Sequence, residues 1–79
     1  MTLRAGVREA LAGHGIEAGP GEAPKALRER LNDLYLEEVR ALKARQRGGE
    51  IPLREYAAHV DALRARFPLL SLPLSAWED

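Results

Sequence analysis

The sequence predicts an all-α fold of three helices, at about residues 3–14, 24–47 and 52–67, arranged around an antiparallel helical hairpin. Two observations predict it. Apolar residues recur at spacings of three and four, which places them on one face of a helix. Glycine or proline stands at the expected beginning or end of each helix, where these residues are commonly found. At 79 residues, the chain has the length of one small domain with a limited core.

The domain is expected to divide into four consecutive segments. These are an N-terminal helix with its cap (1–16), a glycine- and proline-rich loop (17–23), the helical hairpin (24–67) and an apolar tail (68–79). In the loop, Gly19, Pro20 and Gly21 interrupt any regular structure. The loop is therefore either a flexible linker, which leaves the first helix as a mobile arm, or an ordered turn that returns the first helix to the hairpin.

The first helix has a well-specified end. Apolar residues recur every four positions before it, at Leu3, Val7 and Leu11. Gly15 is expected in the left-handed conformation that closes a Schellman motif, with Ile16 packing against Leu11. At the other end of this helix, Thr2 is the expected N-cap.

The second helix should begin at Pro24 and end before Gly48. Counting about 100° per residue, most of its apolar side chains fall within an arc of about 120°, namely Leu27, Leu31, Leu34, Tyr35, Ala41 and Leu42. Val39 lies at the edge of this arc, and Leu36 lies almost opposite its centre. Leu36 is therefore covered by the first helix, by the tail or by a second chain, or it is an ordinary exposed leucine.

The third helix should begin at Pro52 and stop before Pro68. Its apolar residues form one narrow stripe, at Leu53, Tyr56, Val60, Leu63 and Phe67. The connection at 48–51 (Gly-Gly-Glu-Ile) is short, so the third helix must run back antiparallel to the second. Each of these two helices is acidic near its start and basic near its end, so the antiparallel arrangement brings opposite charges together.

The tail at 68–79 is rich in leucine and contains the single tryptophan, Trp77. Pro73 prevents it from forming one continuous helix. Disordered tails are seldom so apolar, and we therefore expect this segment to pack on its own hairpin or on a partner.

The composition excludes several classes of function. Twelve basic side chains balance twelve acidic ones, whereas nucleic-acid-binding proteins normally carry an excess of Lys and Arg. The absence of cysteine excludes disulfides and thiolate zinc sites. No run approaches the roughly 20 apolar residues of a membrane span, and the N-terminus lacks the apolar core of a signal peptide. We therefore expect a soluble, cytoplasmic protein without membrane contact, for which nucleic acid is an unfavoured partner.

No set of residues can be assigned catalytic roles. His14 and His59 are the only histidines, and Glu55 shares a helical face with His59, but two ligands make a poor metal site. The glycine clusters at 13–15 and 19–21 lack the Lys-Ser/Thr pair of a phosphate-binding loop. We expect no enzymatic activity, no cofactor and no metal.

One charged side chain stands out, because Glu38 falls in the middle of the apolar arc of the second helix. Arg45 continues the same line one heptad later. Charges at such positions are costly unless they are paired, and some of them set an oligomeric state. Glu38 and Arg45 therefore either pair across a dimer, or reach to water from a partly exposed arc.

Residues 42–66, through Gly-Gly-Glu-Ile at 48–51 followed by Glu55-Tyr56 and Leu63, resemble short C-terminal helical hairpins that are appended to many bacterial proteins. The likeness covers about a third of the chain, and Pro52 stands where those hairpins carry a Ser or Thr cap. The resemblance implies an interaction module.

The leading functional hypothesis is a non-enzymatic helical protein–protein interaction module that self-associates as a homodimer. Oligomerisation would supplement a core that is small for an independent domain. The candidate interface residues are Leu36, Glu38, Val39, Arg45, Leu72 and Trp77. The alternative is a small regulator that docks on a larger protein or on nucleic acid through the basic end of the second helix at 40–47.

Overall fold

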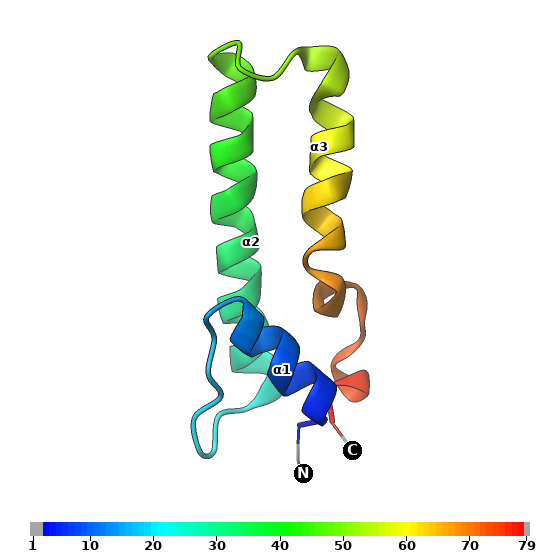
Figure 1. Cartoon of the computed structure of the whole chain (residues 1–79). Helices are drawn as coiled ribbons and strands as arrows, with labels where there is room; N and C mark the ends of the chain where they lie inside the picture. The colour runs from blue at the N-terminus through cyan, green and yellow to red at the C-terminus, as the bar shows by residue number, and fades with distance from the viewer. Residues whose placement is uncertain (1–2, 79) are drawn as a thin grey trace.

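The computed structural model describes residues 3–78 and confirms the predicted all-α hairpin fold. Three α-helices, α1 (Ala5–Gly13), α2 (Pro24–Arg47) and α3 (Leu53–Ala65), are followed by two short 3-10 turns, η1 (Pro68–Ser71) and η2 (Leu74–Ala76). In Figure 1, α2 and α3 run antiparallel, and α1 crosses in front of the end of the hairpin where α2 begins. The two ends of the chain lie close together there (Figure 1), and an isolated antiparallel bridge joins Leu3 to Glu78.

The first helix is shorter than predicted. It begins at Ala5 with Arg4 as its N-cap, and no side chain caps it. Leu3 belongs to the bridge with Glu78 instead of the helix, and the Arg4 N–H donates to the Trp77 carbonyl oxygen at 3.0 Å. The predicted cap, Thr2, lies outside the described residues.

The predicted Schellman motif at the end of α1 is confirmed. Gly15 has a φ of 78°, the Ile16 N–H donates to the Leu11 carbonyl at 2.9 Å, and the Gly15 N–H donates to the Ala12 carbonyl at 2.9 Å. Leu11 and Ile16 are both buried, as the hydrophobic contact of this motif requires. The motif turns the chain from α1 into the loop.

Replacing Gly15 with alanine is expected to destabilise the protein by about 1–2 kcal/mol, since a Cβ disfavours the left-handed conformation. No atom lies within 4 Å of that Cβ, so the loss is conformational and not steric. Gly13→Ala is the matched control, because Gly13 is helical and equally unobstructed. The control should raise stability by no more than about 1 kcal/mol. Denaturant unfolding measures the change in the free energy of unfolding for each variant. A change of the same sign in both variants would contradict this expectation.

The loop between α1 and α2 is an ordered turn organised by Glu22. The Glu22 carboxylate accepts the Gly19 N–H at 2.9 Å and pairs with Arg30 on α2 at 3.1 Å. The Gly19 N–H and then the Arg30 guanidinium stabilise the charged carboxylate, and they lower the pKa of Glu22 below its ordinary value of 4.5. The loop therefore returns α1 to the hairpin.

Glu22→Gln is expected to be less stable than the natural chain near neutral pH, because the amide lacks the charge that Arg30 binds. A group whose pKa is lowered by folding stabilises the fold at pH values above the pKa that the group has in the unfolded chain. This stabilisation is lost as the pH falls through the pKa that the group has in the folded chain. The difference in melting temperature between the two chains should therefore shrink below about pH 4.5 and vanish at lower pH. Melting curves at several pH values measure it. A difference that persisted unchanged at about pH 2 would contradict the assignment.

The hairpin turn repeats the same capping chemistry. Gly49 has a φ of 85°, and the Glu50 N–H donates to the Arg45 carbonyl at 3.0 Å. Ile51 then points inward and is 2% exposed, whereas Leu53 is 73% exposed. Leu53, the first residue of the predicted apolar stripe, therefore lies outside the core, because the turn brings Ile51 to that position. α3 also ends earlier than predicted, at Ala65, and Phe67 is buried beyond it.

The tail lies against the chain's own helices. Leu69 and Trp77 are buried, and the Arg28 guanidinium on α2 donates to the carbonyl oxygens of Leu70 at 3.2 Å and Leu72 at 3.1 Å. Within the described residues, the segment after α3 contains only the two short 3-10 turns. These hydrogen bonds and the two buried side chains hold the segment against the helices. The tail closes the end of the hairpin at which α1 also lies (Figure 1).

The core is concentrated at this closed end. Buried side chains from α1, α2, the loop and the tail meet there, namely Val7, Leu11, Ile16, Leu27, Leu31, Phe67, Leu69 and Trp77. The rest of the hairpin extends beyond it, and the molecule measures 46 × 18 × 17 Å. Its radius of gyration is 14.7 Å, against about 12 Å for a compact domain of this length. The shape leaves half of the hairpin without a third layer.

Candidate functional site

The candidate site is the distal half of the hairpin, residues 38–63, which comprises the second half of α2, the turn and most of α3. α1 and the tail both lie at the other end, and no other described segment covers this half (Figure 1). A surface hollow that His14 and Ile16 share with Leu34 and Glu37 marks how far α1 reaches along α2. Only two helices form the distal half.

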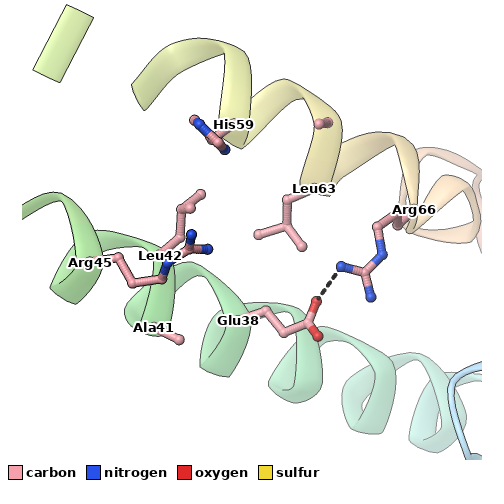
Figure 2. A pocket seen from close by; sticks show the side chains of 8 residues that line it. Glu38, Ala41, Leu42, Arg45, His59, Leu63 and Arg66 are labelled. Carbon is pink, nitrogen blue, oxygen red and sulfur yellow. Dashed lines mark ion pairs between the residues drawn. The ribbon is translucent and has the colours of Figure 1, made fainter. Parts of the chain in front are cut away.

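A groove runs between α2 and α3 in this half, with a volume of about 290 Å³. Its walls come from both helices, and its lining residues are Glu38, Ala41, Leu42, Arg45, His59, Ala62, Leu63 and Arg66. Leu42 and Leu63 are buried. Figure 2 shows these two leucines between the helices, with Glu38 and Arg66 toward one end of the groove and Arg45 and His59 toward the other.

The groove lies on the same side of the hairpin as α1. Leu34, which faces the end of α1, shares one side of α2 with Glu38, Ala41 and Arg45, because helical residues advance by about 100° each. We call this the α1 side. Val39 and Leu36 point toward the opposite side, as does Val60 on α3 by the same geometry.

Charges of both signs line the groove. Glu38 of α2 lies 3.6 Å from Arg66, the residue that follows α3 (Figure 2). An acidic residue of α2 thus meets the basic C-terminal end of the third helix, as the antiparallel arrangement predicts. The distance between Glu38 and Arg66 is too long for a hydrogen bond. The Glu38 Oε2 atom is buried and has no hydrogen-bond partner within the part of the chain that the structure describes. Glu38 is therefore only partly compensated in a single chain.

Arg45 is more exposed than Glu38. Its Nε donates to the Glu50 carboxylate at 2.7 Å, and the two side chains are 53% and 67% exposed. Such surface pairs contribute about 0–1 kcal/mol. The predicted pair joins Glu38 of one copy to Arg45 of another and stays a prediction. Within one chain, Glu38 lies near Arg66 and Arg45 pairs with Glu50.

The structure separates the predicted interface residues. Glu38 and Arg45 line the groove, whereas Leu36 and Val39 lie toward the opposite side of α2. Leu36 is 40% exposed, so neither α1 nor the tail fully covers it. Val39 is partly buried and packs against the core.

Two further interface candidates lie in the tail, away from the groove. Leu72 is 39% exposed. Trp77 is completely buried in the chain's own core. Trp77 therefore offers no surface to a second chain in this conformation, and its place in the predicted interface is corrected to a place in the core.

The histidines have different surroundings. The His14 ring stacks on Phe67 with ring centroids 4.3 Å apart, and Tyr35 meets the same Phe67 edge-on at 5.2 Å. His59 lines the groove. Among residues 3–78, no three His, Asp or Glu side chains come together as a metal site requires. The stacking of His14 on Phe67 joins the end of α1 to the end of α3. The spacing of residues along the sequence could not predict this contact.

Sequence reasoning missed two groove residues, Ala62 and Arg66. It considered His59, but not as a candidate interface residue. Spacing within one helix places residues on a face, but the partner across a groove depends on the register of two helices. The charge pattern was the one available signal, because it placed the basic end of α3 beside the acidic half of α2.

The fold and the groove define an elongated helical-hairpin protein with one closed end and one open half. No protein-family model matches the chain, and no curated protein or solved structure is significantly similar to it. Over residues 3–78, no helix combines the length and the apolar character that crossing a bilayer requires. The function must therefore be inferred from the geometry of the open half.

Proposed function

We propose that this protein is a non-enzymatic helical interaction module that self-associates as a homodimer through the distal halves of two hairpins. The observation that carries the proposal is that a third layer of structure packs on only one end of the hairpin. α1 and the tail complete the core at the closed end, whereas residues 38–63 form two helices alone. A second hairpin placed on this half would complete a helical bundle, in which each helix buries an apolar stripe against its neighbours.

The apolar residues of the distal half support this proposal. Tyr56 of α3 is only partly buried, and Leu53 is exposed. Val39 and Val60 are also only partly buried, on the side opposite α1. In a chain of this size, the core contributes few kcal/mol beyond the entropy of folding, and association commonly supplements it. Burial of partly exposed side chains stabilises an association by about 25 cal/mol per Å² of apolar surface before its entropic cost is subtracted.

Light scattering coupled to size-exclusion chromatography tests the proposal. Over a concentration series, we expect a mass of two chains at high concentration and a decline toward one chain on dilution. A mass of one chain at every concentration up to the millimolar range would overturn self-association. The elongated shape makes elution volume alone misleading, so the mass itself must be measured.

A second candidate function is supported by the basic end of α2. Arg40, Lys43 and Arg47 are all exposed, and they fall within about 60° of one another around the helix. This arrangement would suit a regulator that docks on an acidic protein surface or on nucleic acid. A gel shift with a short DNA duplex that weakens as salt rises would support the nucleic-acid version. An unshifted duplex at low salt would exclude it.

A further inference from the structure

We infer that the two copies pair antiparallel across the α1 side of their distal halves, with Glu38 of each copy against Arg45 of the other. The two-fold axis would cross α2 between Ala41 and Leu42. This inference rests on the proposed self-association and specifies its face and register. The occupant of the groove region is then a second copy of this chain.

Symmetry is the first argument. Glu38 and Arg45 share one side of α2 and lie at equal distances from the point between Ala41 and Leu42. They are about 10 Å apart along the helix, at about 1.5 Å per residue. A two-fold axis at that point places residue 38 of each copy opposite residue 45 of the other, so every contact occurs twice. The surface is therefore complementary in charge to itself.

The second argument is the incomplete pairing of Glu38. Its Oε2 atom is buried without a hydrogen bond within the described residues, and Arg66 remains 3.6 Å away. Arg45 uses Nε for the exposed pair with Glu50. The guanidinium has further N–H groups for a second carboxylate. The Glu38 side chain is 35% exposed, so Arg45 of the other copy would meet the accessible part of this carboxylate and add a second charge-assisted contact beside the one from Arg66.

The third argument is space. On the α1 side, His14 and Ile16, which follow α1, border α2 at Leu34 and Glu37, and no described segment covers the stretch from Glu38 to Arg47 (Figure 1). The proposed axis lies near the middle of this stretch. In this register, the turn at 48–51 of one copy lies opposite residues 32–35 of the other, beside the hollow that His14 and Ile16 share with Leu34. Ala41 is small and exposed beside the axis, which permits close approach of the two α2 helices.

A parallel arrangement is disfavoured by the same geometry. It would bring the α1 helices of both copies to the same end and on the same side of the hairpins (Figure 1). Their bulk would hold the distal halves apart. The opposite side of the hairpin offers the apolar residues Leu36 and Val39, and the exposed Glu29 and Lys43 lie there at equal distances from Leu36. Pairing through that side is the competing arrangement, which cross-linking at residue 36 would reveal.

Charge reversal tests the register. Glu38→Arg and Arg45→Glu are each expected to raise the dimer dissociation constant by about tenfold or more, because each places like charges together twice per dimer. The double variant Glu38→Arg/Arg45→Glu should recover most of the lost affinity, since opposite charges again face each other. Dissociation constants come from light scattering or sedimentation, and circular dichroism with thermal melting checks that each variant is folded.

Cross-linking gives a readout that requires no change of charge. The chain has no cysteine, so a single introduced thiol reacts alone. Ala41→Cys should be joined to the other copy by a short bismaleimide, because residue 41 lies beside the axis. Leu36→Cys, on the opposite side of α2, is the matched control and should remain largely uncross-linked. Both sites are exposed, which keeps the fold intact.

The outcomes separate the two proposals. A natural chain that is monomeric at all concentrations would overturn self-association, and the proposed pairing with it. A natural chain that dimerises with unchanged affinity after charge reversal, and that cross-links through Leu36→Cys instead of Ala41→Cys, would overturn only the face and register of the pairing. Loss of affinity in both single variants, recovery in the double variant and selective cross-linking at residue 41 would support both.

Discussion

Replacing Trp77 with alanine is expected to lower the free energy of unfolding by about 3–5 kcal/mol, the usual loss for a large buried aromatic side chain. Trp77 is 0% exposed and is the largest fully buried residue. Its removal would leave a cavity at the closed end, where the tail, the start of α1 and α2 meet. A domain of this length has a total stability of about 4–12 kcal/mol, so the variant should be partly unfolded at about 37 °C.

The matched control is Leu53→Ala, which also removes a large apolar side chain. Leu53 is 73% exposed, and the change should alter stability by no more than about 0.5 kcal/mol. Thermal melting followed by circular dichroism should therefore show a fall of roughly 12 °C or more for Trp77→Ala and almost none for Leu53→Ala. Equal effects of the two substitutions would show that the tail does not dock as described.

Replacing Phe67 with alanine should have an effect of similar size, about 3–5 kcal/mol. Phe67 is 1% exposed, and its ring contacts His14 near the end of α1 and Tyr35 on α2. The residue therefore connects α1 to both helices of the hairpin. Its loss should loosen α1 as well as lower global stability, so amide hydrogen exchange in α1 should accelerate more than in α2.

Phe67→Leu separates the two contributions of this side chain. Leucine retains most of the apolar volume but lacks the ring that stacks on His14, and swaps of this kind usually cost less than about 1.5 kcal/mol. We therefore expect denaturant unfolding to rank the natural chain first, Phe67→Leu second and Phe67→Ala last. If the leucine variant were as unstable as the alanine variant, ring stacking would outweigh apolar burial at this position.

Local sequence signals predicted the helices well because capping acts over one or two turns. The Schellman motif at Gly15 and the turn at Gly49 each need one residue with positive φ, and glycine supplies it without strain. Proline at 24 and at 52 adjoins the starts of α2 and α3. Spacing alone placed Leu53 on the apolar stripe, but Leu53 lies outside the core, because the turn had already brought Ile51 to the core position.

The candidate site was predicted in part. Glu38 and Arg45 were recognisable because charges interrupt an apolar arc, and such interruptions are visible in a single helix. Arg66 and Ala62 were not recognisable, since their place in the groove depends on how far α3 slides along α2. The prediction that Trp77 is an interface residue was wrong for this conformation, because an apolar tail has the same composition whether it packs on its own chain or on another.

The sequence by itself determined the number of helices, their approximate ends and the antiparallel direction of the hairpin, since these depend on periodicity, capping residues and a short turn. Only the tertiary structure decided that α1 and the tail pack at one end, that Phe67 and Trp77 are central to the core, and that residues 38–63 are left as two helices without a third layer. The physical reason is that burial depends on which distant segments meet, and apolar side chains carry no direction that would specify their partner.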